Sequence, residues 1–435
     1  MKKAALHNLG CKVNAYETEA MQQMLEEAGY EIVPFTEKAD VYVINTCSVT
    51  NIADRKSRQM LHRAKKLNPE AAVVAAGCYV QTKEDEAQKD SAVDILIGNN
   101  QKAQLIEKLD AFFSEKEKKQ VSVLDINHTS QPFEELGLTK TAEHTRAFIK
   151  VQDGCNQFCS YCIIPYARGR VRSRGLESVL KEVEELSKRG CKEVVLTGIH
   201  LSSYGVDCDD NLLHLIREVH KIKGIRRIRL GSLEPRIVTR EFAKELASLE
   251  KICPHFHLSL QSGCDATLQR MNRKYTAAEY EEACDLLREY FAHPAITTDV
   301  IVGFPGETEK EFEVTEAFLN KIHFYEMHIF KYSKRQGTRA AVMENQIPEE
   351  VKTKRSERLI SLARQMSKEF RDYYLGREEE VLFEESVLMD GKQMYVGYTR
   401  EYVKVVTESE IPLDNVMLQG RIVGPVTEEI YRFQC

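Results

Sequence analysis

The chain has 435 residues, enough for two or three domains, and 43% of them are hydrophobic, which supports buried cores. Its net charge of −6 means that composition by itself does not indicate a nucleic-acid partner. The N-terminus lacks the apolar segment of a secretory signal and no run of about 18 apolar residues occurs, so we expect a cytoplasmic protein that has no membrane partner.

Residues 1–125 alternate short apolar runs with polar stretches that have a helical period. This alternation predicts a parallel sheet with helices on its faces, an amino-terminal α/β domain. We expect strands at Ala4–Leu9, Val41–Asn45, Ala72–Ala76 and Asp94–Ile97, and helices at Ala15–Ala28, Ile52–Lys66 and Gln101–Phe113.

Three cysteines in this segment each follow a predicted strand within a few residues. Cys11, Cys47 and Cys78 are about one strand–helix unit apart. Because the carboxyl ends of parallel strands lie at one edge of a sheet, where such folds bind ligands, these thiols can converge. The alternative is three unrelated buried thiols, since a free cysteine packs as a small hydrophobe. Twelve cysteines in a reducing compartment favour metal or redox use over disulfides.

Residues 126–144 are polar, contain Pro132 and Gly137 and have no clear period, which indicates a linker. Residues 145–372 then contain six apolar runs separated by helical stretches. The runs are Phe148–Val151, Glu193–Thr197, Arg227–Gly231, Phe256–Leu260, Ile296–Val302 and Glu326–Phe330. They predict a partial (β/α)6 barrel, a fold that gathers its chemistry at the carboxyl ends of its strands.

The loop after the first of these strands contains Cys155, Cys159 and Cys162 in the spacing C-x3-C-x2-C. Three thiolates satisfy three irons of a 4Fe–4S cluster and leave the fourth iron open, whereas most clusters are held by four cysteines. A structural zinc site is the alternative, but zinc requires a fourth Cys or His at ligand spacing, and none follows closely. The spacing therefore predicts an iron–sulfur cluster with one open iron.

This motif, with Tyr161 before its last cysteine, resembles the radical S-adenosylmethionine (SAM) superfamily, whose members bind SAM at the open iron. Nearly the whole chain resembles one branch of the methylthiotransferases, the threonylcarbamoyladenosine tRNA methylthiotransferases. The strings LGCKVN, CNQFCSYCIIPYARGR, TGIHLSSYG, LSLQSG and DVIVGFPGE carry the resemblance. It implies a second 4Fe–4S cluster on Cys11, Cys47 and Cys78, again with one open iron. It also implies that residues 1–125 are the family's amino-terminal domain and residues 145–372 its radical SAM core.

Several strand ends of the predicted barrel carry candidates for contact with SAM. Gly198 permits close backbone approach, and Glu234 and Gln261 can hydrogen-bond an amine or a ribose. With Tyr161 they are the predicted SAM contacts, although each strand end can instead be a plain turn. The sister branch, which acts on isopentenyl-type adenosines, tends to have the residues Gly-Gln-Asn where this chain has Gly198-Ile199-His200. We therefore expect a substrate-side role for His200, against the alternative of a structural histidine.

Four arginines at alternate positions follow the cysteine loop. They are Arg168, Arg170, Arg172 and Arg174, which share one face if the segment is extended. Arginine matches the geometry of phosphates and carboxylates, so we expect this face to contact RNA phosphates or the SAM carboxylate. The alternative is ion pairing with Glu177 and its helix.

The C-terminal part of the chain combines a basic helix at Val351–Arg377 with strand-like runs at Glu380–Val387, Gln393–Tyr398, Tyr402–Thr407, Met417–Val423 and Ile430–Phe433. Residues 373–435 predict a small all-β barrel and resemble the TRAM domain, an RNA-binding module of tRNA-modifying enzymes. With 6 basic and 12 acidic residues, this segment is a poor electrostatic partner for phosphate. RNA contact must therefore use a limited face. The expected residues are Tyr395, Tyr398, Arg400 and Lys404.

The resemblance implies a transferase that adds a methylthio group to C2 of N6-threonylcarbamoyladenosine, next to the tRNA anticodon. Its implied cofactors are two 4Fe–4S clusters and SAM, and its implied partners are tRNA, an electron-donor reductant and a sulfur donor. Methylthiolation of another tRNA adenosine or of a ribosomal-protein aspartate is an alternative activity. The alternative outside enzymes, an iron–sulfur RNA-binding sensor, has no need for a vacant SAM position.

Overall fold

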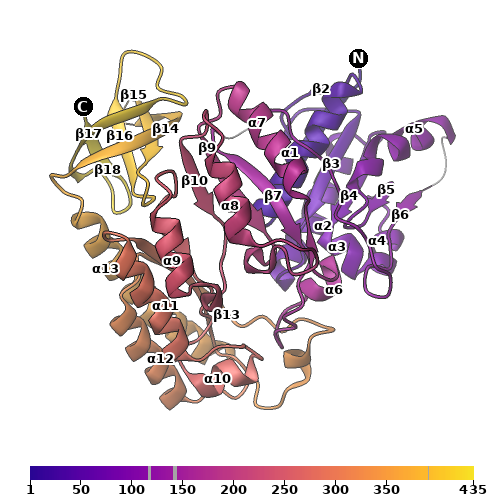
Figure 1. The fold of residues 1–435 in the computed structure, drawn as a ribbon. Helices are drawn as coiled ribbons and strands as arrows, with labels where there is room; N and C mark the ends of the chain where they lie inside the picture. Colours follow the sequence, from indigo (N-terminus) through magenta and orange to yellow (C-terminus); the bar gives the residue numbers. More distant parts are fainter. Residues whose placement is uncertain (116–118, 141–144, 390) are drawn as a thin grey trace.

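The computed structural model describes residues 1–115, 119–140, 145–389 and 391–435. Three units follow one another in the chain: a parallel sheet covered by helices, a partial barrel and a small closed β-barrel. Figure 1 shows the first sheet and the small barrel at opposite ends of the molecule, with the partial barrel between them. Among the described residues, no helix is both long and apolar enough to span a bilayer.

The first sheet has six parallel strands in the order β2-β1-β3-β4-β5-β6. Its strands are β1 (Lys3–Asn8), β2 (Glu31–Ile32), β3 (Val41–Thr46), β4 (Ala72–Gly77), β5 (Ile95–Ile97) and β6 (Gln120–Ser122). β3 and β4 are buried at every position, as expected for strands that helices cover on both faces. The edge strands β2 and β6 were not predicted, because two or three residues leave no apolar run to detect.

Helices cover both faces of this sheet. They are α1 (Lys12–Glu27), α2 (Asn51–Leu67), α3 (Cys78–Thr82), α4 (Glu84–Lys89), the 3-10 turn η1 (Lys102–Gln104) and α5 (Leu105–Glu115). Met21 of α1 and Leu109 of α5 pack in the core on one face. Leu61 of α2 and Tyr79 of α3 pack in the core on the other. The predicted parallel α/β unit is therefore confirmed.

The partial barrel has six parallel strands in chain order. They are β7 (Ala147–Asp153), β9 (Glu193–Gly198), β10 (Arg227–Leu230), β11 (His255–His257), β12 (Ala295–Val302) and β13 (Glu326–Lys331). They form two sheets, β10-β9-β7-β8 and β11-β12-β13. Isolated parallel bridges join the two sheets, for example the bridge between Leu233 and Leu258. β8 (Arg172–Ser173) is short and runs antiparallel to β7. The predicted partial (β/α)6 barrel is confirmed.

Helices α7, α8, α9, α11 and α12 pack in one core against the outside of this barrel. The helical segments are α6 (Ile164–Arg168), α7 (Leu176–Lys188), η2 (Leu201–Ser203), α8 (Leu212–His220), η3 (Pro235–Ile237), α9 (Arg240–Ala247), α10 (Asp265–Arg270), α11 (Ala277–Tyr290), α12 (Glu309–Ile322) and η4 (Arg339–Val342). In β12, Ile296, Val300 and Val302 belong to this outer core. Because alternate residues of a strand face opposite sides, Thr297 and Asp299 face the inside of the barrel.

A long helix, α13 (Glu349–Asp372), connects the partial barrel to the C-terminal unit. The C-terminal unit is a closed barrel of five strands in the order β14-β15-β16-β18-β17. They are β14 (Glu378–Met389), β15 (Lys392–Tyr398), β16 (Lys404–Glu408), β17 (Met417–Pro425) and β18 (Tyr431–Gln434). Phe370 of α13 and Tyr374 just after it pack into the core of this barrel with Tyr325. The predicted all-β tail is confirmed, and the end of α13 is part of its core.

Candidate active site

A glycine turn opens the loop that follows β7. Gly154 has a φ of +71°, and a Cβ at this position would lie 1.8 Å from the carbonyl oxygen of Arg170, so only glycine fits. The turn lets the backbone N–H of Cys155 donate to the carbonyl of Gly169 at 3.0 Å. Further along the loop, Ser160 donates from its N–H and its hydroxyl to backbone carbonyls at the end of α10. The loop is thus tied to its own return segment and to the far side of the barrel.

Cys155, Cys159 and Cys162 line one cavity of about 130 Å³, which we call the cysteine cavity. All three thiols are free. Burial disfavours a thiolate and raises the pKa of Cys155 to about 11 and that of Cys162 to about 12. Such thiols ionise readily only beside a cation, and the iron of a 4Fe–4S cluster is one. Three converging sulfur donors therefore fit a cluster that keeps one iron open.

The guanidinium of Arg273 also lines the cysteine cavity, and sequence analysis did not identify it. Its Nη1 donates to the sulfur of Cys159 at 3.2 Å, and its Nη2 donates to the carbonyl of Ser259. A buried positive charge in contact with sulfur stabilises the anionic form of the thiol. Arg273 follows α10 in the chain with no spacing that relates it to the cysteines, so only tertiary structure brings it to them.

The predicted SAM contacts divide into two groups. Tyr161, Glu234 and Gln261 all line the cysteine cavity. Gly198 is not among its lining residues; it ends β9, and a Cβ there would meet the side chain of Gln152 at 2.8 Å. The missing side chain at Gly198 makes room for Gln152, and a direct contact between Gly198 and SAM stays a prediction.

Gln261 has an unusual backbone conformation for a residue with a side chain. Its φ is +72°, in the left-handed region that favours glycine. Its N–H donates to the carbonyl of Asp299 at 2.8 Å, and its carbonyl accepts from the N–H of Ile301 at 2.9 Å. These bonds to β12 hold a strained residue in the wall of the cavity, a feature that clusters at functional sites.

His200 lines the cysteine cavity with one ring nitrogen free. Its Nδ1 lies 2.6 Å from the hydroxyl of Ser203, while its Nε2 is buried and has no hydrogen-bond partner among the described residues. Burial lowers the pKa of His200 to about 4, so the imidazole is neutral near pH 7. The backbone N–H of His200 donates to Gln152, which also donates to the carbonyl of Gly154. A buried polar atom without a partner indicates that a ligand or water completes the site.

The other predicted cysteines lie at the carboxyl ends of neighbouring strands. Cys11 follows β1 and immediately precedes α1, Cys47 follows β3, and Cys78 follows β4 and begins α3. The loops are in contact, because a Cβ at Gly10 would lie 3.1 Å from the sulfur of Cys47. The side-chain amide of Asn99 donates to the sulfur of Cys78 at 3.4 Å. The parallel sheet therefore brings together three loops that are far apart in the sequence.

In this second set Cys47 and Cys78 are buried and Cys11 is exposed. Loss of contact with water raises the pKa of the Cys11 thiol. Burial, with the neighbouring Cys78, also raises the pKa of Cys47 to about 12. The donor set again fits a metal cluster with one position open to a small ligand.

The two sets of thiols adjoin each other. α6, which begins two residues after Cys162, packs against α3, which begins with Cys78. The amide of Asn99 bridges them, because it donates both to the sulfur of Cys78 and to the carbonyl of Ala167, at 2.7 Å. The two sets of thiols are therefore connected through one short helix from each unit.

The predicted exposed face of four arginines is wrong. Arg168, Arg172 and Arg174 are buried, and only Arg170 is exposed. The segment is not extended throughout, since Arg168 ends α6 and Gly169 turns the chain with a φ of +71°. Arg174 pairs with Glu182 of α7 at 2.5 Å, so the alternative of ion pairing with that helix holds, but at Glu182 and not at Glu177. A substrate contact at Arg170 stays a prediction.

Arg168 is wholly buried in an ion-pair network between the first two units. Its guanidinium donates to Glu17 of α1 at 2.8 Å and to Asp153 of β7 at 3.1 Å. Lys150 of β7 pairs with both carboxylates, at 2.8 and 2.7 Å. Lys102 also pairs with Glu17, at 3.1 Å. Charges buried in this way are retained only when each is paired, so the network positions α1 against β7.

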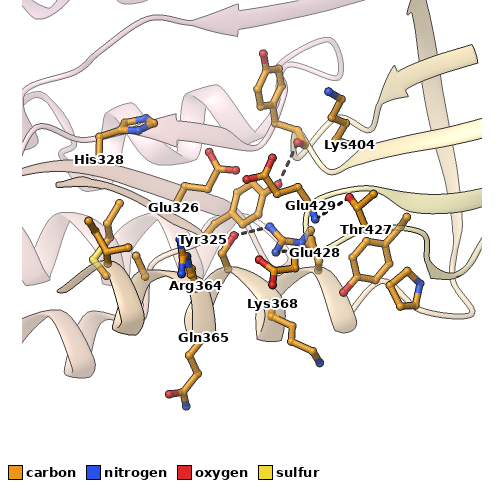
Figure 2. A pocket seen from close by; sticks show the side chains of 18 of the residues that line it. Tyr325, Glu326, His328, Arg364, Gln365, Lys368, Lys404, Thr427, Glu428 and Glu429 are labelled. Atoms are coloured by element: carbon orange, nitrogen blue, oxygen red, sulfur yellow. Dashed lines mark hydrogen bonds between the residues drawn. The ribbon is translucent and has the colours of Figure 1, made fainter. Parts of the chain in front are cut away.

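A larger cavity of about 970 Å³ lies between α13, β13 and the small barrel (Figure 2). Tyr398 and Lys404, two of the expected RNA contacts, line it. The other two are engaged elsewhere: Tyr395 is buried in the barrel core, and Arg400 donates to backbone carbonyls near β11. The predicted RNA-binding face of these four residues is therefore wrong as a single surface, because Tyr395 packs inside the small barrel and Arg400 is bonded to the segment before β11.

Comparison with known proteins follows the same division of the chain. Residues 149–319 match the model of the radical SAM superfamily, and residues 3–98 match that of the uncharacterized protein family UPF0004. The chain is 43% identical to the threonylcarbamoyladenosine tRNA methylthiotransferase MtaB of Bacillus subtilis, covering 93% of this chain and 90% of the relative. The enzyme of the same name from Aquifex aeolicus is also 43% identical, over 93% and 98%.

More distant similarities extend in two directions. A tRNA-2-methylthio-N(6)-dimethylallyladenosine synthase of Acetivibrio thermocellus is 37% identical, over 97% of this chain and 88% of the relative. Among solved structures, the radical SAM methyltransferase TsrM from Kitasatospora setae superposes with a TM-score of 0.58 at 17% identity, covering 79% of this chain and 74% of that one. The second similarity concerns the fold alone.

Proposed function

The chain belongs to the methylthiotransferase family of radical SAM enzymes, in the threonylcarbamoyladenosine tRNA branch, and on this premise we propose that it adds a methylthio group to C2 of N6-threonylcarbamoyladenosine next to the tRNA anticodon. The observation that carries the proposal is the adjacency of two sets of three thiols across α3 and α6. One set suits SAM cleavage and the other suits a sulfur source, so a reaction that needs both finds them side by side.

Cys155, Cys159 and Cys162 are proposed to hold a 4Fe–4S cluster, with SAM at its open iron. When bound, the cluster and SAM supply the one-electron chemistry that reaches an unactivated C–H bond, which acid–base side chains cannot. Arg273 keeps positive charge beside the sulfur of Cys159. Tyr161, which lies in the same wall, is proposed to shield the site from water.

Glu234, Gln261 and His200 are proposed to orient SAM and the substrate base. Glu234 is buried and pairs with Arg236 at 2.7 Å, and its carboxylate oxygens can accept a hydrogen bond from an amine or a ribose hydroxyl. Neutral His200 offers its free Nε2 to a polar atom of the ligand. Gly198 acts indirectly, because it leaves room for Gln152, which accepts from the N–H of His200.

Cys11, Cys47 and Cys78 are proposed to hold a second 4Fe–4S cluster, which makes sulfur available for C2. The hydrogen bond from Asn99 to the sulfur of Cys78 and the exposed position of Cys11 support a ligated cluster that a small sulfur species can reach. The reaction also needs a reductant and a sulfur donor as partners, and we place it in the cytoplasm, where tRNA is modified.

The substrate base must leave its stack in the anticodon loop to reach the cysteine cavity, at a cost of a few kcal/mol. We propose that residues 373–435, as a TRAM-like unit, and the basic helix α13 hold the tRNA while residues 145–372 act as the radical SAM core. Residues 1–125 form the second cluster unit, and residues 126–144 link the two. The large cavity between α13 and the small barrel supports an approach of RNA from this side.

Two measurements test the proposal. Anaerobic incubation of the reconstituted protein with dithionite and SAM is expected to release 5′-deoxyadenosine, and its absence would favour a non-catalytic sensor. Mass spectrometry of tRNA nucleosides from a deletion strain is expected to lack the methylthio derivative of N6-threonylcarbamoyladenosine. Loss of a methylthio derivative of a different adenosine would instead move the chain to another branch.

A further inference from the structure

Two histidines and one aspartate lie together on the inner wall of the partial barrel, and the proposed reaction does not use them. His257 ends β11, Asp299 lies in β12 and His328 lies in β13. In the parallel register Asp299 is paired with His328, and His257 is paired with Thr297, two residues before Asp299. Since alternate residues share a face, the three side chains project from neighbouring strands on the same side.

The ligand atoms of these residues have the separations of a cation site. One ligand atom from each of His257, Asp299 and His328 lies within 4.8 Å of the other two. Nε2 of His257 is 3.3 Å from Oδ2 of Asp299. Two atoms that each lie about 2.1 Å from one tetrahedral cation are about 3.4 Å apart, so this pair is already at the spacing that a shared cation requires.

A hydrogen bond to the second ring nitrogen orients His257, as is usual for histidines that bind metals. Nδ1 of His257 lies 3.0 Å from the hydroxyl of Thr297, which directs Nε2 toward Asp299. The ring of His257 lies near that of His328, with centroids 6.0 Å apart and planes inclined by 30°. His328 is exposed and lines the 970 Å³ cavity, and Figure 2 places it at one side of that cavity. A cation at this position can therefore be reached from the cavity.

We propose that His257, Asp299 and His328 bind a divalent first-row transition cation, of the zinc or ferrous iron class, with open positions for an oxygen ligand. Two imidazoles and one carboxylate are the donors that these cations favour in sites with exchangeable positions. A divalent cation that is bound by two imidazoles and one carboxylate carries a net charge of +1. It therefore attracts an anionic ligand, whereas Asp299 alone would repel one.

The ligand class follows from the position of the site and rests on the proposed function. The chain continues from His257 through Ser259 to Gln261, and the last two line the cysteine cavity. Four residues of extended chain span about 13 Å. C2 and C6 of adenine flank N1, so the N6 substituent of a base whose C2 faces the cysteine cavity lies to one side of that cavity. We assign the open positions of the cation to the carboxylate of that threonylcarbamoyl substituent.

The cation site is tested with zinc alone, using the anaerobically reconstituted protein and metal analysis after equilibrium dialysis. The wild-type protein is expected to bind one zinc per chain. The variants His328→Ala and Asp299→Asn are each expected to bind this zinc at least about tenfold more weakly than the wild-type protein does. His328 is exposed, so its substitution leaves the core intact. His214→Ala is the matched control, since His214 is an exposed histidine that pairs with Asp210 on the outside of the molecule. Zinc binding that is absent, or equal in all four proteins, overturns the site.

The ligand assignment is tested with two anticodon stem-loops that differ only in the threonylcarbamoyl group. The zinc-loaded wild-type protein is expected to prefer the modified loop by about tenfold, and His328→Ala is expected to lose that preference. An equal preference in both proteins overturns the carboxylate assignment. The zinc measurement needs no turnover, so a chain that binds zinc at these residues but does not methylthiolate tRNA would refute the proposed function and leave the cation site standing.

Discussion

The two sets of cysteines reach a similar arrangement by different routes. Cys155, Cys159 and Cys162 lie in one loop, which a glycine turn opens and which is bonded to its return segment and to the end of α10. The other set comes from three loops that only the parallel sheet brings together. The spacing of the first set is fixed along one loop, whereas the spacing of the second set depends on the register of three strands. We therefore expect the second set to be the first to lose its geometry when the protein is strained.

The network around Arg168 joins the two sets. Burial by itself would raise the pKa of Asp153, but the charges of Lys150 and Arg168 lower it well below its usual range. Glu17 lies in α1, the helix that Cys11 immediately precedes, and Asp153 lies two residues before Cys155. The same ion pairs thus hold the first residue of each set, and the substitutions below separate the contributions of the two sites from that of the network.

The largest expected effect is at the set built in one loop. Cys159→Ala removes one of three iron ligands, so we expect no 5′-deoxyadenosine and a fall in bound iron from about eight to about four per chain. Anaerobic product analysis and iron determination measure both. Cys208→Ala is the control, because Cys208 is exposed and belongs to neither set. SAM cleavage at the wild-type rate in Cys159→Ala would contradict the assignment.

The next expected effect separates the two sets. Cys47→Ala should leave SAM cleavage measurable while methylthiolated tRNA falls to nothing, because Cys47 belongs only to the set proposed to supply sulfur. Product nucleosides and 5′-deoxyadenosine are quantified in the same anaerobic reaction. If Cys47→Ala still methylthiolates tRNA at the normal rate, the sulfur does not come from this set.

A smaller effect is expected from breaking the network between the sets. Arg168→Met leaves Glu17 and Asp153 with fewer partners in a buried position, which lowers the free energy of unfolding by about 3–5 kcal/mol. Urea unfolding of the anaerobic protein measures this loss. Arg170→Met is matched in chemistry but lies at an exposed position, and it should change stability by less than about 0.5 kcal/mol. If the two variants lose the same free energy of unfolding, the ion-pair network does not stabilise the protein.

The smallest expected effect is on the pH dependence of stability, and it comes from His200 in the cysteine cavity. Burial lowers the pKa of His200 from its ordinary 6.5 to about 4, so the unfolded chain binds a proton before the folded one does as pH falls. Wild-type stability is therefore lost between about pH 6.5 and pH 4, and at pH 5 the loss is about 1–2 kcal/mol. His200→Gln should lack this component when urea unfolding is compared at pH 7 and pH 5. An unchanged pH dependence would mean that His200 is not buried as a neutral ring.

Sequence analysis located most of the elements because their signals are local. The strands that are buried on both faces, such as β3 and β4, left continuous apolar runs, and the partial barrel repeated one strand–helix pattern. It missed β2, β6 and α3, which are too short to show a period. It misjudged the arginine segment, since the turn at Gly169 breaks the alternation on which the exposed face depended.

By itself the sequence determined the spacing of Cys155, Cys159 and Cys162 and the family to which their loop belongs. It also indicated a parallel sheet, whose strands all end at the edge where Cys11, Cys47 and Cys78 can converge. Only the tertiary structure decided which charges meet these thiols. Arg273 reaches Cys159 from 114 residues away, and Asp299 meets His257 across 42. Contacts of this kind leave no periodic signal, because they depend on how separate elements pack and not on how one element is built.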